Sequence, residues 1–231
     1  MNKKIIVIPA KGNSSGIKRK NLLKFCGKPL IYWTIVQAIK NKIGAKVFVS
    51  SESDEILNYS KKMGVNIIRR PKSLTKKNSS SESAIIDVCE KIKVKDCDII
   101  FLQVTSPLRY PNDIKNAYIA FKKKKLDSLF SCYKSDGFFD IWTQKNKRYI
   151  PITIDYKKRV MRQNFKNKHI QQNGSIYIFK KKILYRYKNR IGGKIGIHPM
   201  KNWQTFELDT IDQKKNMELL FLNNLIKYYK K

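Results

Sequence analysis

The feature that most constrains the fold is a regular alternation of short apolar runs with amphipathic stretches. Apolar runs of strand length occupy residues 5–10, 45–51, 65–68, 98–104 and 127–133. Helical patterns separate them, at residues 29–40, 53–63, 81–93 and 111–124. This alternation predicts βαβ units and an α/β domain with a doubly wound, mostly parallel sheet.

Local signals support these boundaries. Pro29 stands where a helix begins and where a missing N–H costs nothing. Ser53 can cap the next helix, with two acidic residues in its first turn. Further along the chain, residues 175–179 predict a returning strand and residues 211–228 a closing helix. Ligands of such sheets bind beyond the carboxyl ends of the strands, so we expect the site there.

Residues 134–172 interrupt the alternation. The segment is rich in Lys, Asn, Tyr and Phe and is too long for a plain loop in a compact domain. We interpret it as an insertion with strands of its own, a dimerisation arm within a single domain of residues 1–231. It would expose Phe138, Phe139, Ile141, Trp142, Tyr149, Ile150, Ile152 and Ile154, which a small monomer rarely does.

Composition narrows the possible partners. The net charge of +33 suggests nucleic acid, but the lysines are spread along the chain and the densest run, 122–125, falls at a predicted helix end. We therefore expect no nucleic-acid partner; the alternative is a basic RNA-binding module using residues 149–165. No apolar run approaches the ~20 residues of a membrane span, so we expect no membrane and a cytoplasmic location. Four scattered cysteines and two histidines disfavour zinc.

The loop after the first strand, KGNSSGIKRKN at residues 11–21, has the composition of an anion site. Gly12 and Gly16 would let the backbone turn its N–H groups inward. Lys11 and Lys20 would neutralise a triphosphate. The loop matches neither a Walker A motif nor G-x-G-x-x-G, and a solvated turn is the alternative.

The segment IPAKGNSSGIKRKNLLKFCGKPLIYWTI resembles the opening of the acylneuraminate cytidylyltransferases, also called CMP-sialic acid synthetases. Five further blocks resemble that family in the same order: VFVSSESDEI, RRPKSLTKKNSSS, FLQVTSPLR, QNGSIYIF and FELDTIDQKKNMEL. The resemblance implies a Rossmann-like fold and transfer of CMP from CTP to a sialic-acid-type nonulosonic acid, such as N-acetylneuraminate or legionaminic acid, with release of pyrophosphate. It also implies a role in cell-surface polysaccharide biosynthesis. Pseudaminic acid, an eight-carbon acid and a catalytically inactive paralogue are the alternatives.

The resemblance also implies site residues. Those implied to bind the nucleotide are Lys11, Gly12, Ser14, Lys20, Asn21, Arg70, Ser79 and Ser81. Those implied to bind the sugar are Gln103, Arg162, Asn173 and Tyr177, and those implied in catalysis are Arg162, Lys20 and Asp209. The chain departs from the family at Lys11, which lacks the bidentate fork of the usual arginine, and by one extra residue between Arg162 and Asn173. Arg109 is either a ligand or a structural ion-pair partner.

A magnesium site is expected at Glu207 and Asp209. Alternation along a final strand would place both carboxylates on one face, where they can hold Mg²⁺ together with a triphosphate. The family commonly has Asp where this chain has Glu207. The alternative is that Asp209 caps the closing helix. The partners implied are CTP, an acidic nine-carbon sugar and a second copy of the chain, with Arg162 in its own or the neighbouring site.

Overall fold

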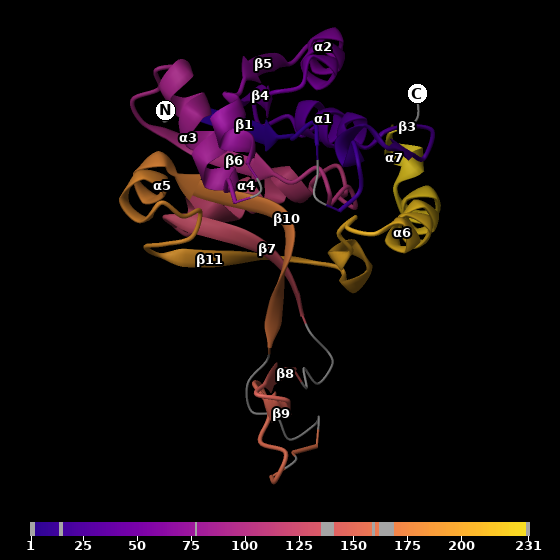
Figure 1. Cartoon of the computed structure of the whole chain (residues 1–231). Helices are drawn as coiled ribbons and strands as arrows, with labels where there is room; N and C mark the ends of the chain where they lie inside the picture. Colours follow the sequence, from indigo (N-terminus) through magenta and orange to yellow (C-terminus); the bar gives the residue numbers. More distant parts are fainter. Residues whose placement is uncertain are drawn as a thin grey trace.

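A computed structural model of the chain describes residues 3–13, 16–76, 78–134, 141–158, 160–161 and 169–229. Its centre is a seven-stranded sheet with the order β11-β7-β10-β6-β1-β4-β5 (Figure 1). These strands are β1 (Lys3–Pro9), β4 (Lys46–Ser51), β5 (Asn66–Arg69), β6 (Cys97–Leu102), β7 (Ser128–Lys134), β10 (Ile170–Lys180) and β11 (Ile195–Met200). The predicted α/β class is confirmed.

Strand directions confirm a mostly parallel sheet. β1 runs parallel to β4 and β6, β4 is parallel to β5, and β11 is parallel to β7. β10 is the exception, because it is antiparallel to both β6 and β7. The chain runs from β1 outward to β4 and β5 and then returns to β6 on the other side of β1, which places a topological switch point between β1 and β6.

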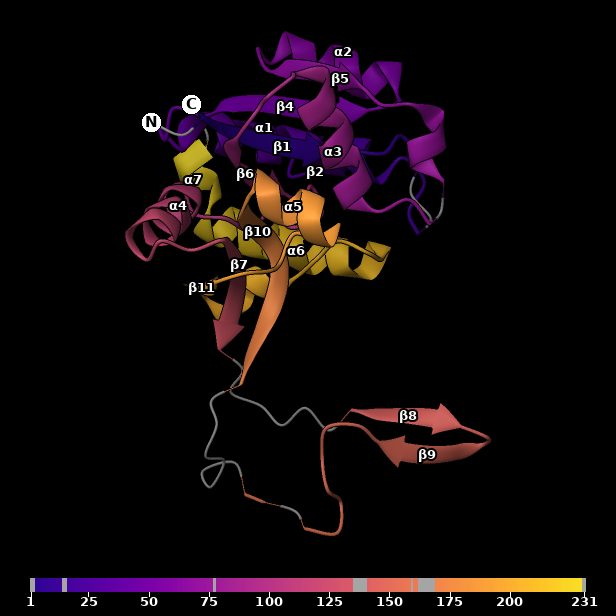
Figure 2. The same cartoon turned by 90° about the vertical axis from the view of Figure 1, so that its left-hand side faces the viewer.

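Two apolar layers enclose the sheet. In β1, Ile6 and Ile8 face one layer, and Ile5 and Val7 face the other, all fully buried. The first layer includes buried residues of α1 (Leu30–Lys40), α2 (Asp54–Lys62), α4 (Asp113–Lys123), α6 (Ile211–Asn224) and α7 (Ile226–Tyr229). The second includes residues of α3 (Ser81–Lys91) and α5 (Lys181–Tyr187). Figure 2 shows α5 in front of the sheet and α6 behind it.

Two helices begin directly after the capping serine and the proline that the sequence analysis identified. Ser53 caps α2, with its Oγ accepting from the N–H of Ile56, and α1 begins directly after Pro29. The closing helix begins in a capping box of Thr210 and Gln213 and is divided into α6 and α7. The remaining short elements are η1 (Lys20–Leu22), β2 (Lys24–Phe25), β3 (Lys28–Pro29), η2 (Lys72–Thr75) and η4 (Asn202–Thr205).

The described part of residues 134–172 contains two strands outside the seven-stranded sheet. β8 (Trp142–Lys145) and β9 (Arg148–Pro151) pair as an antiparallel hairpin, which stands away from the body in both views (Figures 1 and 2). Tyr149 is 72% exposed and Ile152 62%. Ile154 is half-buried rather than exposed, while Phe138 and Phe139 lie outside the described residues.

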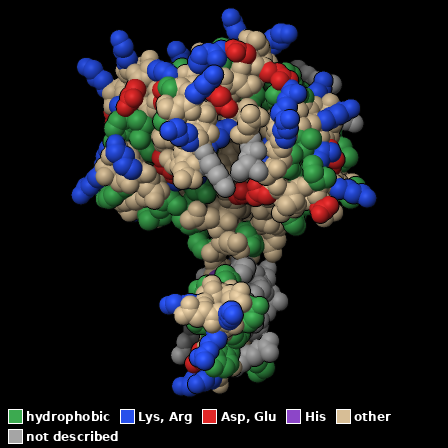
Figure 3. Space-filling model, viewed as in Figure 1, with side chains coloured by type: hydrophobic (Ala, Val, Ile, Leu, Met, Phe, Trp, Pro, Cys, Tyr) green, Lys and Arg blue, Asp and Glu red, His purple; other side chains and the backbone are tan. Residues whose placement is uncertain are grey.

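The described helices include none long and apolar enough to cross a membrane. All four cysteines are free, and three of them are buried. Lys and Arg side chains are scattered over the face in Figure 3 with Asp and Glu between them, which matches the even spread of lysine along the sequence.

Candidate active site

The segments that follow β1, β4, β5 and β6 all leave the same edge of the sheet, because these strands are parallel. They carry the loop at residues 11–22, Glu52, Arg70 and Gln103, respectively. Figure 3 shows a hollow in the body with acidic side chains beside it. The predicted position of the site, beyond the carboxyl ends of the strands, agrees with this convergence.

The glycines of the first loop are required for close packing. Neither Gly12 nor Gly16 has a positive φ, contrary to the expected use of glycine's backbone freedom. A Cβ on Gly12 would lie 2.9 Å from the Cβ of Ser53, and one on Gly16 would lie 3.2 Å from the carbonyl oxygen of Asp209. The N–H of Gly12 donates to Glu52 Oε1 at 2.7 Å. The loop is therefore packed against the segment that follows β4 and against the backbone of Asp209.

Lysine 11 connects the first loop to the serine-rich segment. Its Nζ donates to the carbonyl oxygens of Lys76 and Ser79, each at 3.2 Å. Asn21, which is buried, donates from Nδ2 to the carbonyl oxygen of Lys11 at 2.8 Å. The predicted nucleotide residues Lys11, Asn21 and Ser79 are thus brought together, while Ser14 lies outside the described residues.

Lys20 bridges this loop to the opposite side of the site. Only 7% of the residue is exposed, yet its Nζ lies 2.8 Å from Oδ1 of Asp209, whose side chain is 61% exposed. Burial of a lysine is costly without a partner, so Asp209 stabilises the ammonium group. The pair joins residues that are 189 positions apart, and it places a cation and a carboxylate at the mouth of the site.

Glu207 and Asp209 do not end a strand, so that expectation was wrong. Residues 206–209 form an extended segment after η4, held by a hydrogen bond from the N–H of Leu208 to the carbonyl oxygen of Thr105. Leu208 is fully buried, Glu207 is half-buried and Asp209 is exposed. Thr210 rather than Asp209 caps α6. The carboxylate of Asp209 is therefore not used as a helix cap.

The two carboxylates influence each other. Burial, and then the negative charge of Asp209, raise the pKa of Glu207 above its ordinary value. Lys20, Arg109 and Arg190 oppose the rise. Gly174 lies against Glu207, since a Cβ there would be 1.6 Å from Glu207 Oε1 and 3.4 Å from Gln103 Oε1. The arrangement collects oxygen atoms from Gln103, Glu207 and Asp209 at one edge.

This donor set fits magnesium. Mg²⁺ is commonly held by one or two carboxylates together with substrate phosphates rather than by a complete protein cage. No group of three or more His, Cys, Asp or Glu side chains suited to a metal occurs among the described residues. The carboxylates of Glu207 and Asp209, beside a loop that carries Lys11 and Lys20, have the composition that a shared site of this kind requires.

Arg70 is largely buried, since only 3% of it is exposed. Its Nε donates to Ser50 Oγ at 3.1 Å and its Nη2 to the Ser50 carbonyl oxygen at 2.6 Å. Burial lowers its pKa. Ser81, the first residue of α3, is half-buried.

The predicted sugar residues lie around β10. Asn173 is 2% exposed and its Oδ1 accepts from Ser131 Oγ at 2.6 Å, so it fixes the backbone between β7 and β10. Tyr177 stacks on Phe101 with 5.6 Å between ring centroids. Gln103 is half-buried at the end of β6. Arg162 lies outside the described residues.

Arg109 is a structural residue. Its guanidinium group is fully buried and donates to Gln37 Oε1 at 2.9 Å and to the carbonyl oxygens of Gln103 and Ser175 at 2.6 and 2.8 Å. These acceptors are uncharged, so it is not the ion-pair partner that was one alternative. Burial lowers its pKa to about 10. It ties β6 to β10 directly beneath Gln103.

Sequence reasoning missed Arg190. It lies between α5 and β11, neither of which was predicted, and its guanidinium carbon is 4.7 Å from the ring centroid of Tyr177. Its Nε is 2.6 Å from Oε1 of Glu82. The segment KNRIGGK belongs to none of the recognised blocks, so only the tertiary structure reveals it.

The pKa of Glu207 gives a stability prediction. Since its folded-state pKa is raised, its contribution to stability is present below the unfolded pKa and is lost as pH rises through the folded value. At pH 8 the half-buried carboxylate is charged, so we expect Glu207→Gln to have a higher Tm than the wild type. At pH 4.5 the difference in Tm should be smaller. Thermal unfolding at both pH values measures this, with Glu90→Gln on the exposed face of α3 as the control. A Tm difference independent of pH would contradict it.

Comparisons with known proteins agree with this geometry. The family model described as "Cytidylyltransferase" matches residues 5–231. N-acylneuraminate cytidylyltransferase of Oncorhynchus mykiss is 30% identical over 207 residues, 88% of this chain and 46% of that protein. The enzyme of that name from Streptococcus agalactiae serotype III is 28% identical over 215 residues, 91% of this chain and 51% of that protein. The chain thus spans about half the length of these relatives.

Two further comparisons extend this result. Pseudaminic acid cytidylyltransferase of Campylobacter jejuni is 32% identical over 133 residues, 56% of this chain and 57% of that protein. The structure of CMP:2-keto-3-deoxy-manno-octonic acid synthetase complexed with CTP has a TM-score of 0.72 and 18% identity, covering 96% of this chain and all of that one; it shows the shared fold. With a family match over nearly its whole length, this chain belongs to the cytidylyltransferase family.

Proposed function

We propose that the protein transfers CMP from CTP to a sialic-acid-type nonulosonic acid and releases pyrophosphate. The observation that carries the proposal is the contact of Lys20 with Asp209, which joins a phosphate-type loop to a pair of carboxylates at the switch point of the sheet. Relatives named as N-acylneuraminate cytidylyltransferases over about nine-tenths of this chain support the choice of substrates.

The nucleotide would lie along the loop after β1. Lys11 and Lys20 would neutralise the β- and γ-phosphates, while Asn21 and the segment at residues 70–81 would seat the cytidine. Phosphoryl transfer needs positioning and charge neutralisation above all. Lys20 is suited to this role because it is held rigidly by burial and by Asp209.

The acceptor sugar would lie on the β10 side, near Gln103 and Tyr177. Its anomeric hydroxyl would attack the α-phosphorus in line with the departing pyrophosphate. Magnesium held by Asp209 and Glu207 would supply neutralisation of the developing phosphate charge and activation of that hydroxyl. We expect a carboxylate of the pair to accept the hydroxyl proton, since neither histidine has a position suggesting that role.

The direct test is turnover of CTP with N-acetylneuraminate, followed by release of pyrophosphate and formation of the CMP-sugar. The kcat/KM for CTP should exceed the values for ATP and GTP by at least ~100-fold. A site that forms hydrogen bonds with the edge of cytosine would leave polar groups unpaired with another base. Comparable use of ATP would refute the assignment.

A pseudaminic acid is the second candidate acceptor, favoured by the 32% identity to an enzyme named for that substrate. Parallel assays with N-acetylneuraminate, legionaminic acid, pseudaminic acid and an eight-carbon keto-sugar acid distinguish these. A CTP-dependent enzyme of this kind would act in the cytoplasm. An RNA-binding role has less support, since the basic side chains form no single surface in the view of Figure 3.

We also propose that the protein is a homodimer. The arm exposes Trp142, Tyr149 and Ile152 well away from the body, and a second copy would remove these side chains from water. Sedimentation at micromolar concentration should give about twice the 27.2 kDa of one chain. Tyr149→Glu with Ile152→Glu should shift the protein toward 27.2 kDa, while an unaltered mass would contradict the arm as the interface.

A mixing experiment tests whether Arg162 serves the neighbouring site. An Arg162→Ala chain and an Asp209→Asn chain should each be nearly inactive. Their mixed dimer should regain one working site if Arg162 acts in the partner. Absence of recovery, with subunit exchange demonstrated by labelled chains, would place Arg162 in its own site.

A further inference from the structure

Arg190 lies over two aromatic rings of the central sheet. Its guanidinium carbon lies 4.9 Å from the ring centroid of Phe101 and 4.7 Å from that of Tyr177. The two rings belong to register partners on β6 and β10 and are stacked with an interplanar angle of 17°. A guanidinium held on aromatic faces keeps its edge free for hydrogen bonds.

The carboxylate of Glu82 fixes the orientation of Arg190. Nε of Arg190 donates to Glu82 Oε1 at 2.6 Å, and the side chains are 21% and 11% exposed. Glu82 lies in the first turn of α3. Within the described chain, the two Nη atoms of Arg190 have no hydrogen-bond acceptor. They are therefore donors available to a ligand.

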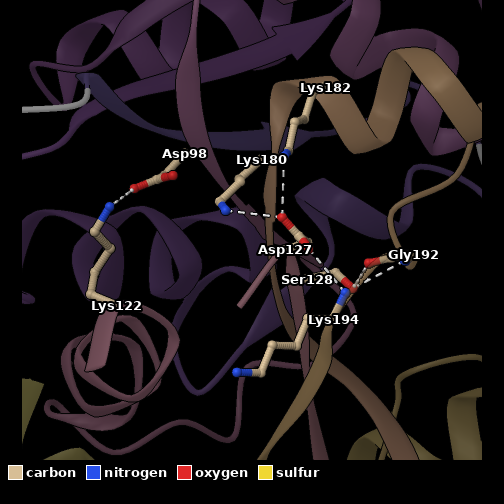
Figure 4. Close-up of polar contacts among 8 residues, drawn as sticks. All are labelled: Asp98, Lys122, Asp127, Ser128, Lys180, Lys182, Gly192 and Lys194. Carbon is tan, nitrogen blue, oxygen red and sulfur yellow. Dashed lines mark hydrogen bonds and ion pairs between the residues drawn. The ribbon is translucent and has the colours of Figure 1, made fainter. Parts of the chain in front are cut away.

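The loop that carries Arg190 is anchored to β7. Figure 4 shows Ser128 and Gly192 joined twice: Ser128 Oγ donates to the Gly192 carbonyl oxygen at 2.8 Å and accepts from the Gly192 N–H at 3.0 Å. Asp127 accepts from the N–H of Lys194 at 3.0 Å and pairs with Lys180 at 2.9 Å. These contacts hold the pKa of Asp127 at about 2. The loop is therefore tied to β7 close to Arg190, which favours a pre-organised position for that side chain.

Arg190 lies near Glu207 and Tyr177, on the side where the acceptor sugar is proposed to bind. Burial is the main cause of the raised pKa of Glu207, and the charge of Arg190 is among those that oppose it. The same charge opposes the rise caused by burial in the pKa of Tyr177. Arg190 is thus within electrostatic reach of Glu207 and lies beside β10. The phosphate loop follows β1, on the other side of β6.

The local charges indicate the kind of group that Arg190 binds. Glu82 already neutralises the guanidinium, and Glu207 adds negative charge nearby. A carboxylate of the substrate would be repelled by two carboxylates, Glu82 and Glu207, with only one guanidinium to attract it. A neutral oxygen acceptor would not be repelled in this way. A carbonyl oxygen of an acylamino substituent meets this requirement and accepts two N–H donors.

We propose that Arg190 is a specificity-determining residue that donates from its Nη atoms to the carbonyl oxygen of an acylamino group on the acceptor sugar. This inference rests on the proposed CMP transfer and adds a substrate preference to it. The wild-type protein should prefer an acylamino acid to the otherwise identical acid with a hydroxyl in that position.

The test compares N-acetylneuraminate with its analogue in which a hydroxyl replaces the acetamido group. Arg190→Met should lower kcat/KM for N-acetylneuraminate about 10- to 100-fold, the usual effect of losing a hydrogen bond from a charged donor. The loss should appear mainly in KM, and the hydroxyl acid and CTP should keep their values. Arg190→Lys should recover little, since the amine lacks the planar fork.

Controls separate binding from stability. Arg186, whose guanidinium carbon lies 5.3 Å from the Tyr187 ring on α5, gives the matched variant Arg186→Met, which should leave both acids unaffected. If Arg190→Met folds poorly because Glu82 loses its partner, the double variant Glu82→Gln, Arg190→Met removes both charges. Equal losses for the two acids, or no loss for either, would overturn the inference while leaving CMP transfer intact. Absence of turnover with every acid in the wild type would instead refute the proposed function and this inference with it.

Discussion

Asp209→Asn should lower kcat/KM for CMP transfer about 10³-fold, since it removes the carboxylate that would hold magnesium and that orients Lys20. Two effects combine in this variant. The neutral amide is a poor ligand for magnesium, and it loses the charge-assisted bond that holds Lys20 at 2.8 Å. Steady-state kinetics with CTP and the acidic sugar measure the loss.

Some stability should also be lost in this variant, because the largely buried Lys20 would keep only a neutral amide as its partner, so the activity is measured where urea unfolding shows the variant to be folded. Asp212→Asn is the matched control, since Asp212 lies exposed in the first turn of α6 only three positions away. Its activity should remain near that of the wild type. EDTA should inactivate the wild type to a similar extent. Full activity in EDTA, or an active Asp209→Asn variant with the fold intact, would rule out the magnesium mechanism.

The sheet was predictable where its strands are buried on both faces. All of β6 and the four central residues of β1 are buried, so their apolar runs differ clearly from the lysine-rich remainder of the sequence. β11 was missed because it is an edge strand, only partly buried, with Gly196 and Pro199 in its sequence. The sequence pattern also carried no sign that β10 is antiparallel, since pairing direction depends on where the arm returns the chain.

The site was predictable where it lies on loops that follow buried strands. Lys20, Asn21, Gln103 and Asp209 are brought to one edge by the parallel strands and the final crossing. Other polar residues that the sequence suggested as ligands are buried and have partners within the protein. Arg70, Arg109 and Asn173 bond mainly to the protein, and a linear pattern does not distinguish a buried polar side chain that has partners from one that contacts a ligand.

Gly174→Ala is expected to reduce kcat/KM about 10²-fold, because a Cβ at this position would displace Glu207. The atom would lie 1.6 Å from Glu207 Oε1 and 2.6 Å from its Cδ. Since the obstacle is the end of a flexible side chain, the carboxylate would move while the fold persists. Glu207 is a proposed magnesium ligand, and displacement of a catalytic group by about 1 Å is enough for a loss of that size.

Gly44→Ala provides a control that isolates this displacement. Gly44 has a φ of +69°, close to the +66° of Gly174, and nothing within 4 Å of its added Cβ. Both variants should lose about 1–2 kcal/mol of stability from the positive φ, as measured by urea unfolding. Only Gly174→Ala should lose activity. Because its effect acts through Glu207, combining it with Glu207→Ala should add almost nothing to the loss caused by Glu207→Ala alone. Fully additive losses, or an active Gly174→Ala variant, would show that the position of this carboxylate does not control turnover.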